Sequence, residues 1–301
     1  MKSWLKRLAV LVVALGLVGL LAPTASANPG AYPGSKSYPA YNARTWAGPA
    51  VPYLGGYVPQ GLAHWKAQDD LIVSYYDDND SLDRSLLAIV DRISGKVKKH
   101  VYILSGHVGG MAVSGKYLWV ADTVGTKSFV RRYSLAALKS TTNGHYLGFQ
   151  KLYTVKASSY LTVAGGDVWV GRFTTTFAQA STLYRYNITK AGNLSKNPIA
   201  SIATPGRVQG AAFSGNYVFF SQSYGRTNAS RITVKNRKTG KSRYLLAPTQ
   251  SEDITIADGW LYILYESGAS FYRYGEDGKG RSKNPITRLH YASVSGLKGL
   301  V

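Results

Sequence analysis

The stretch Leu194–Ile202 reads LSKNPIASI, and the stretch Arg281–Leu289 reads RSKNPITRL. Both contain Ser-Lys-Asn-Pro-Ile, and the two copies lie 87 residues apart. A chance match of five residues is improbable in a chain of 301 residues, whereas duplication of a structural unit produces such a match readily. The repeat therefore indicates a fold that is built from copies of one unit.

The sequence that precedes each copy repeats as well. Both flanks contain a short apolar stretch, a Gly/Asp turn, a β-rich run with Trp, a loop and a run that ends in Tyr-Arg-Tyr. Three further segments fit the same template, and successive units start 43 to 50 residues apart. The five units begin at Gln60, Gly109, Ser159, Gln209 and Glu252.

Each unit contains four candidate strands. In the fourth unit we expect them at 209–213, 216–222, 230–236 and 242–247, because these runs are rich in Val, Ile, Tyr and Phe and are separated by turn residues. No window of twelve or more residues after the first 27 keeps a helical period. Four strands in about 40–50 residues are typical of a propeller blade. The sequence therefore predicts an all-β, five-bladed β-propeller with four antiparallel strands per blade. Six blades are the alternative, and a β-sandwich or a solenoid are the competing folds.

The first 27 residues have the composition of a secretory signal peptide. Three bases (Lys2, Lys6, Arg7) precede the apolar run 8–22, and small residues end the segment at Ala27. We therefore expect a secreted, extracellular protein; an uncleaved membrane anchor is the alternative. Residues 28–56 form a segment rich in Pro, Gly and Tyr, and residues 57–301 form the propeller. The part 43–57 could supply a ring-closing strand or a degenerate sixth blade.

Basic residues outnumber acidic residues, 36 to 15, which gives a formal charge of +21, and there is no cysteine. The lack of cysteine excludes thiol catalysis and thiolate metal sites. A basic surface favours polyanions such as acidic polysaccharide or an anionic cell-wall polymer; a solvated basic face is the alternative. Mild clusters at 92–99 and 235–243 are predicted on the outer rim. No helix-turn-helix, zinc finger or arginine-rich arm is recognisable, so specific nucleic-acid binding is not expected.

Strand direction predicts which residues meet at one mouth of the central channel. First strands leave that face and second strands return to it, so the starts of the former and the ends of the latter open there together. Amides, carboxylates and aromatic rings that converge in this way are typical of a ligand site. The alternative is that these groups only bond to one another across a narrow channel. The predicted ligand-binding residues are Gln60, Tyr75, Asp122, Arg172, Gln209, Gln222, Glu252, Tyr265 and Glu266.

Four carboxylates near the mouth are candidate catalytic acids for a glycoside hydrolase or lyase, which needs an acid and a base or nucleophile at the scissile bond. They are Asp122, Glu252, Asp253 and Glu266. We assign no catalytic residue, because their spacing cannot be derived from the sequence.

One acidic loop is a candidate calcium site. Asp77, Asp78 and Asp80 could offer oxygen ligands, but the EF-hand spacing is missing and a solvated acidic turn is the simpler interpretation. The five histidines are not paired at ligand spacing, so no zinc site is expected. No cofactor is predicted.

The openings PQGLA (Pro59–Ala63) and VQGAAF (Val208–Phe213), with the signal segment and the absence of cysteine, resemble secreted β-propeller proteins of actinobacteria. The resemblance covers residues 56–293, and its motifs are short. It implies an extracellular protein; some members of the group have no demonstrated catalysis, including one that promotes protease autolysis and is cross-linked by transglutaminase. No residue role is transferred from this group.

We therefore predict a monomeric, secreted propeller that binds a glycan, an anionic cell-surface polymer or an extracellular protein at its channel mouth. The first alternative is an extracellular carbohydrate-active hydrolase or lyase. A cell-wall protein that is held there by its positive charge is a further alternative.

Overall fold

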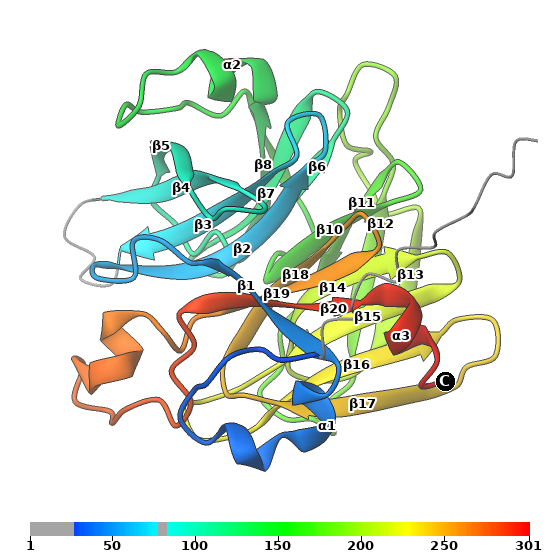
Figure 1. Cartoon of the computed structure of the whole chain (residues 1–301). Helices are drawn as coiled ribbons and strands as arrows, with labels where there is room; N and C mark the ends of the chain where they lie inside the picture. Colours follow the sequence, from blue (N-terminus) through cyan, green and yellow to red (C-terminus); the bar gives the residue numbers. More distant parts are fainter. Residues whose placement is uncertain (1–26, 78–82) are drawn as a thin grey trace, which may run out of the picture.

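The strands of this protein are arranged as five sheets around one axis (Figure 1). The computed structural model describes residues 27–77 and 83–301, and within this part each sheet has four antiparallel strands. Neighbouring innermost strands contact one another all the way round, from β2 to β6, β10, β14, β18 and back to β2. The molecule is a five-bladed β-propeller, as the sequence predicts.

Four blades are formed by strands that are consecutive in the chain. Blade 1 contains β2 (Tyr57–Trp65), β3 (Asp70–Asp77), β4 (Arg84–Asp91) and β5 (Val97–Leu104). Blade 2 contains β6 (Gly110–Ser114), β7 (Tyr117–Val124), β8 (Lys127–Ser134) and β9 (Lys151–Thr154). Blade 3 contains β10 (Tyr160–Ala164), β11 (Asp167–Gly171), β12 (Ser181–Tyr186) and β13 (Ala200–Thr204). Blade 4 contains β14 (Val208–Ser214), β15 (Tyr217–Gln222), β16 (Ser230–Asn236) and β17 (Ser242–Ala247). The observed blade starts differ from the predicted ones by one to three residues.

The fifth blade joins the two ends of the described chain. It contains β18 (Ser251–Ala257), β19 (Trp260–Tyr265) and β20 (Arg288–Ser293), and its outer strand is the N-terminal β1 (Thr45–Ala50). In Figure 1 the blue β1 lies along the red β20, and Trp46 pairs with Tyr291 in the antiparallel ladder. The segment 43–57 therefore closes the ring and does not form a sixth blade.

A buried hydrogen-bonded group holds this closure. The Tyr41 hydroxyl lies 2.7 Å from the Tyr265 hydroxyl and 2.8 Å from His290 Nδ1. Tyr41 belongs to the short helix α1 (Pro39–Asn42), which follows the 3-10 turn η1 (Ser35–Ser37). Burial lowers the pKa of His290 to about 3, so its imidazole is neutral at ordinary pH. The N-terminal segment is thus attached through a neutral imidazole and two phenols.

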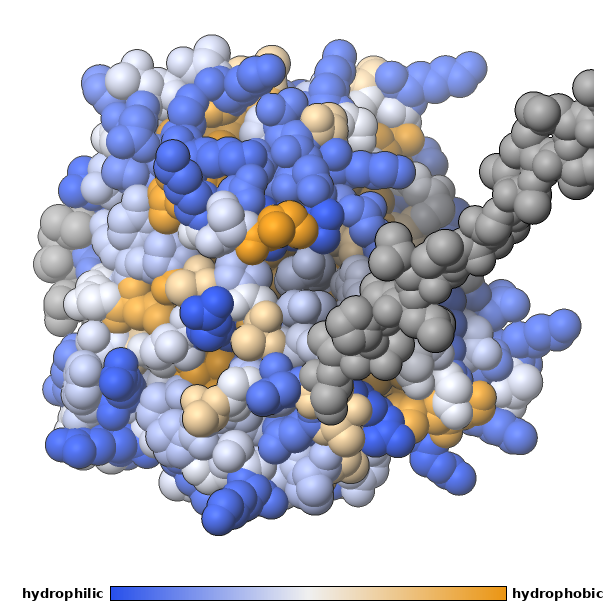
Figure 2. All heavy atoms as spheres, viewed as in Figure 1, coloured by the Kyte–Doolittle hydropathy of each residue, from blue (hydrophilic) through white to orange (hydrophobic). Residues whose placement is uncertain are grey.

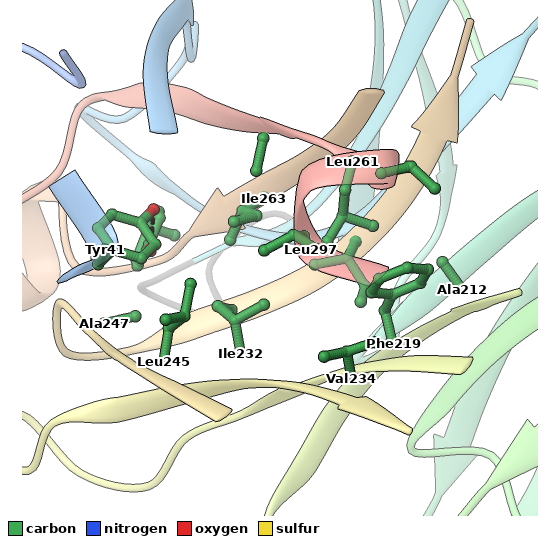
Figure 3. Close-up of a cluster of buried hydrophobic side chains, with 14 of the residues drawn as sticks. Tyr41, Ala212, Phe219, Ile232, Val234, Leu245, Ala247, Leu261, Ile263 and Leu297 are labelled. Atoms are coloured by element: carbon green, nitrogen blue, oxygen red, sulfur yellow. Dashed lines mark hydrogen bonds between the residues drawn. The ribbon is translucent and has the colours of Figure 1, made fainter. Parts of the chain in front are cut away.

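Hydrophobic side chains fill the spaces between neighbouring blades. The described residues form five buried clusters, one at each of the five blade junctions. Figure 3 shows the cluster between blades 4 and 5, where Phe219 and Ile232 face Leu261 and Ile263. Leu297 of the C-terminal helix α3 (Val294–Lys298) covers the same cluster. Both faces of the central strands are therefore buried, which explains their long apolar runs.

The innermost strands approach one another too closely for side chains at some positions. A Cβ added to Gly110 would lie 2.5 Å from the backbone nitrogen of Leu161, and one added to Gly210 would lie 2.7 Å from the Asp253 Cα. Only glycine fits such contacts between backbones. Gly210 belongs to the second Gln-Gly pair, and a Cβ added to Gly61 of the first pair would lie 2.5 Å from Ser74 Oγ and 2.9 Å from Met111 Cγ, so close packing explains the glycine in both pairs.

The two Ser-Lys-Asn-Pro-Ile copies occupy different places in their blades. The copy that ends at Ile199 directly precedes β13, an outer strand, as expected. The copy that ends at Ile286 precedes β20, which is the third strand of its blade. Because Pro198 and Pro285 have no N–H to donate to a strand ladder, the sequence predicts that both copies precede or open an outer strand. This prediction is wrong for the second copy, because blade 5 takes its outer strand from the N-terminus.

The second Tyr-Arg-Tyr run, Tyr272–Tyr274, does not form a strand. Tyr184, Arg185 and Tyr186 end β12, whereas Tyr272 to Tyr274 lie in the π-helical turn η2 (Phe271–Gly275). The amides of Tyr272 and Arg273 both donate to the Ala269 carbonyl and wind the chain into this turn. The connection between β19 and β20 is 22 residues long. It borders the channel mouth.

The outer surface is mostly polar. Figure 2 shows hydrophilic residues over most of the visible face, with small hydrophobic spots between them. Both predicted basic clusters lie at turns between third and fourth strands, on the outer rim of blades 1 and 4. The six-residue helix α2 (Leu135–Ser140) lies beyond β8. None of the helices in the described part is long and apolar enough to cross a membrane.

Candidate functional site

Three innermost strands bulge where they reach the channel mouth. The pairing register shifts between Pro59 and Gly61 in β2 and between Val208 and Gly210 in β14. It also shifts within β18, between Ser251 and Ile254. A bulge redirects the side chain of the extra residue. Gln60, Gln209 and Glu252 occupy these bulges, and all three line the mouth pocket.

The mouth pocket has a volume of about 530 Å³ and is open to solvent. This volume lies in the range of small-molecule sites, about 300–1,000 Å³. Its floor is formed by amides and carboxyl groups, and its walls carry aromatic rings. The pocket is lined by Gln60, His107, Thr123, Ser159, Phe173, Gln209, Ser223, Tyr224, Gly225, Arg226, Gln250, Glu252, Glu266 and Tyr272.

Two carboxyl groups meet on the floor of the pocket. Glu252 and Glu266 hydrogen-bond to each other, which requires a proton between them. Burial raises the pKa of Glu252 well above its usual range, and the adjacent Glu266 raises it further. Burial also raises the pKa of Glu266, but hydrogen bonds from Gln250, Gln60 and other neighbours oppose this rise. The pair therefore retains a proton that two separate, solvated carboxyl groups would release.

Amide groups orient this carboxyl pair. Gln60 Nε2 donates to Glu266 Oε2 and Gln250 Nε2 donates to Glu266 Oε1, both at 3.1 Å. Gln209 Nε2 donates to Glu252 Oε1, also at 3.1 Å. These donors come from three different blade starts, so the pair is held by the ring as a whole.

Gln250 has two unusual features. Its backbone has a φ of 60°, in the left-handed region that L-residues rarely adopt. Its side chain is buried, yet the carbonyl oxygen Oε1 has no hydrogen-bond partner in the described part of the chain. Because a buried acceptor without a partner is costly, such atoms are candidates for ligand contact.

Tyr272 and His107 line one side of the pocket, and Tyr76, which does not line it, lies between them. The Tyr272 hydroxyl lies 3.1 Å from the Tyr76 hydroxyl, and the Tyr76 ring stacks on His107 at a centroid distance of 5.7 Å. Burial raises the pKa of Tyr272, and the charge of Glu266 adds to the effect, so the phenol stays protonated. Desolvation by the surrounding protein lowers the pKa of His107, although its side chain reaches solvent and Asp122 acts in the opposite direction. This wall therefore offers neutral hydrogen-bonding groups at neutral pH.

A loop contact fixes the rim of the pocket between blades 4 and 5. Arg226, from the β15–β16 loop, makes a two-pronged ion pair with Asp277 at 2.7 and 2.6 Å. The Lys283 amide also donates to the Arg226 carbonyl at 2.9 Å. The charge of Arg226 is thus neutralised before any ligand arrives.

Asp253 lies next to Glu252 but fills the channel instead of the pocket. Its Oδ2 accepts the amides of Leu62 at 2.9 Å and Met111 at 3.2 Å, and its Oδ1 accepts the amide of Ile254 at 2.9 Å. Burial raises the pKa of Asp253, while these three donors favour the ionised form. The carboxyl group connects blades 5, 1 and 2.

Among the nine predicted ligand residues, the structure brings together four at the pocket: Gln60, Gln209, Glu252 and Glu266. Five do not line it: Tyr75, Asp122, Arg172, Gln222 and Tyr265. In three of the second strands the residue after the predicted one lines the pocket instead: Thr123, Phe173 and Ser223; in the fifth blade Glu266 was itself predicted beside Tyr265. The strand-end assignment was therefore one residue too early, and a shift of one residue turns a side chain away from the mouth.

The displaced residues have other partners. Asp122 forms a buried ion pair with Arg131, so it is not available as a catalytic acid in the pocket. Gln222 donates to the Gly206 carbonyl at 2.6 Å. Tyr75 and Tyr265 are fully buried between blades, in the clusters described above. Arg172 is exposed and directly precedes the lining residue Phe173.

Several pocket residues were missed because they lie in loops that the strand template does not describe. Gln250 comes just before β18, and Tyr272 lies in the turn that replaced an expected strand. The others in this class are His107, Tyr224 and Arg226. The alternation of strands and turns did not point to Gln250. Its position directly before the first strand of blade 5 is the signal that could have identified it.

Two of the three residues in the calcium hypothesis, Asp78 and Asp80, lie outside the described residues. In residues 27–77 and 83–301, no group of three or more His, Asp or Glu side chains could hold a metal ion.

Comparison with known proteins finds solved structures that have a similar fold but low sequence identity to this chain. No protein family matches the sequence, and no curated protein does. The PQQ-bound aldose sugar dehydrogenase from Streptomyces coelicolor is 12% identical with a TM-score of 0.47, over 83% of this chain and 98% of that one. A putative glucose dehydrogenase from Thermus thermophilus is 12% identical with a TM-score of 0.44, over 82% and 99%. A chain of a nidogen/laminin complex is 11% identical with a TM-score of 0.44, over 70% and 73%.

Proposed function

We propose that this protein is secreted and binds carbohydrate in the mouth pocket. The observation that carries the proposal is the buried Gln250 carbonyl oxygen, which has no hydrogen-bond partner in the described part of the chain and belongs to a residue that lines the pocket. A sugar hydroxyl can donate to this oxygen and, through its own lone pairs, accept from a neighbouring donor.

The rest of the pocket supports a ligand with many hydroxyl groups. Glu266 offers a carboxylate, and Gln60 and Gln209 offer amides on the same floor. Phe173, Tyr224 and Tyr272 supply ring surface on the walls, against which the apolar face of a sugar ring can pack. Such a mixture of directed polar groups and aromatic walls is usual for sites that recognise polar small molecules.

The charge of the pocket favours a neutral sugar unit. Glu252 and Glu266 together carry one negative charge, and the nearby Arg226 is already paired with Asp277. An anionic group on the floor would meet that charge without a free cation. The anionic cell-surface polymer that the sequence suggested is therefore not proposed as the occupant of the floor.

A carbohydrate-active enzyme is the second candidate, because the pocket holds two carboxyl groups. Glycoside hydrolysis uses carboxyl groups about 5–5.5 Å or about 6.5–9.5 Å apart. Glu252 and Glu266 hydrogen-bond to each other, which is closer than either arrangement. Asp122 and Asp253 are bound to other groups, so neither serves as a second acid that faces the pair.

A glycan-array screen, followed by an assay for released reducing ends, tests both candidates. Saturable binding without hydrolysis supports the proposal, and release of new reducing ends supports the enzyme. Absence of binding to any neutral glycan contradicts the proposal. Mass spectrometry of the exported protein tests secretion, which requires an N-terminus at Asn28 after cleavage behind Ala27.

A further inference from the structure

A row of alternating arginine and aromatic side chains extends from the mouth pocket across blades 3 and 4. Arg207 Cζ lies 5.2 Å from the Tyr224 ring centroid and 4.4 Å from that of Phe177. Arg231 Cζ lies 3.9 Å from the same Phe177 centroid and 4.4 Å from that of Tyr244. We call Tyr224, Arg207, Phe177, Arg231 and Tyr244 the arginine ladder.

The ladder begins at the pocket and ends at the outer edge of blade 4. Tyr224 lines the pocket, and its ring lies 5.9 Å from the ring of Phe173, another lining residue. Tyr244 lies in the outer strand β17 and is 50% exposed. A polymer chain with one end in the pocket could therefore follow the ladder outward.

The positive charges of the ladder are not neutralised by the protein. In the described part of the chain, no carboxylate lies within 4.0 Å of Arg207 or Arg231, whereas Arg92, Arg185 and Arg226 each have one. Arg207 Nε donates to the Thr175 carbonyl at 2.8 Å, which fixes one edge of that guanidinium. Held between aromatic rings, both groups keep N–H donors for an oxyanion and lose little conformational freedom on binding it.

We propose that the arginine ladder binds the acidic units of a polysaccharide chain. The choice of carbohydrate rests on the proposed function of the mouth pocket, and the negative charge of the bound groups follows from the ladder itself. Guanidinium groups bind carboxylates and related oxyanions through two parallel hydrogen bonds. The ligand is therefore a chain that places a neutral unit in the pocket and acidic units on the rim.

The ladder is less suited to single-stranded nucleic acid. Proteins bind such strands by stacking bases on exposed aromatic faces. Phe177, at the centre of the ladder, contacts guanidinium groups from both Arg207 and Arg231. The Phe177 ring is therefore occupied by contacts within the protein, which leaves the two outer rings of the ladder, Tyr224 and Tyr244, separated by a pair of guanidinium groups.

The test uses polygalacturonate, its methyl ester and poly-uridylate as probes of the whole protein at low salt. The ester has the same backbone as polygalacturonate without its charge. The variant R207Q/R231Q removes both ladder charges, and K238Q/K241Q removes two exposed charges from a turn of the same blade outside the ladder. R231K keeps the charge but loses the planar group. Melting temperatures confirm that each variant is folded.

We expect R207Q/R231Q to weaken polygalacturonate binding at least tenfold, R231K at least threefold, and K238Q/K241Q less than twofold. The ester should bind more weakly than the acid to the unmodified protein. Equal losses in the two double variants would show that only overall charge matters and would overturn the proposal. Tighter binding of poly-uridylate that depends on Arg207 and Arg231 would assign the ladder to nucleic acid instead.

The two proposals fail in different ways. If neutral oligosaccharides do not bind but the polygalacturonate result holds, the pocket proposal fails and the ladder remains an oxyanion site. If neutral oligosaccharides bind and neither double variant affects polygalacturonate, the pocket proposal stands and the ladder proposal is wrong.

Discussion

Gln60 and Glu266 are 206 positions apart in the chain, and Gln60 Nε2 donates to Glu266 Oε2 across 3.1 Å. One residue belongs to the first blade and the other directly follows β19 in the fifth, so the contact spans the junction at which the ring closes. The same carboxylate receives a hydrogen bond from Gln250. The floor of the mouth pocket therefore forms only when the first and fifth blades come together.

Replacement of Glu252 by Gln should stabilise the protein, increasingly so as the pH rises. The pKa of Glu252 is raised from 4.5 in the folded state. Above that pH the unfolded chain releases the proton and the folded protein keeps it, so stability falls by about 1.4 kcal/mol per pH unit until the folded pKa is reached. Gln mimics the protonated acid and has no such loss.

Urea unfolding at pH 4 to 7 measures this effect. The free energies of unfolding of E252Q and the unmodified protein should agree near pH 4 and diverge between pH 5 and 7. E266Q is the matched control and should be destabilised, because Glu266 accepts hydrogen bonds that an amide nitrogen cannot accept. A pH-independent difference for E252Q would show that Glu252 is ionised in the folded protein.

His290 should cause a loss of stability in weak acid. Its folded pKa is about 3, below the ordinary value of 6.5. As the pH falls below 6.5 the unfolded chain gains a proton that the folded protein does not, so stability decreases by about 1.4 kcal/mol per pH unit. Between pH 4.5 and 6.5 the effect of Glu252 has the opposite sign and masks this slope.

The E252Q background therefore exposes the histidine. Between pH 6.5 and 5 the free energy of unfolding of E252Q should fall relative to that of E252Q/H290Q, because the raised pKa values of Asp253 and Glu266 affect both variants alike. Identical slopes in the two proteins would mean that His290 is protonated in the fold and that the neutral contact with Tyr41 is wrongly assigned.

Gln250→Gly should separate binding from stability. Glycine relieves a left-handed conformation that costs roughly 1–2 kcal/mol for other residues, and this offsets the lost hydrogen bond to Glu266, about 0.5–1.5 kcal/mol. The melting temperature should therefore change little, while affinity for a neutral oligosaccharide should fall about 3- to 10-fold. Calorimetric titration and thermal melts measure the two quantities; unchanged affinity would remove Gln250 from the site.

The repeated pattern allowed most of the fold to be predicted, because each blade uses the same alternation of β-formers and turns. In blade 4 the predicted strand 230–236 matches β16 (Ser230–Asn236). Blade 5 was predicted less well, since its outer strand comes from Thr45–Ala50, and no local pattern joins segments so far apart in the chain. The turn at Tyr272 follows Gly268, where a Cβ would collide with the Ile286 carbonyl, and the repeat template does not contain this close approach.

The site was predicted only in part. Gln60 and Gln209 were identified because both stand at the start of a first strand in the repeat template, and first strands begin at the mouth. Asp122 was assigned to the mouth, although its neighbour Thr123 lies there. The error arises at the strand end, where Asp122 still packs between blades and Thr123 is exposed. Loop residues such as His107 follow no period, so the sequence pattern did not reveal them.

Filling the mouth pocket tests the central claim most directly. Thr123→Trp places an indole in the pocket, whereas Val124→Trp adds the same group at a neighbouring residue that is 55% exposed and does not line it. Calorimetric titration with a neutral oligosaccharide identified on the array should show at least a tenfold loss of affinity for T123W and less than a twofold change for V124W. Equal affinity of T123W and V124W would contradict carbohydrate binding in the mouth pocket.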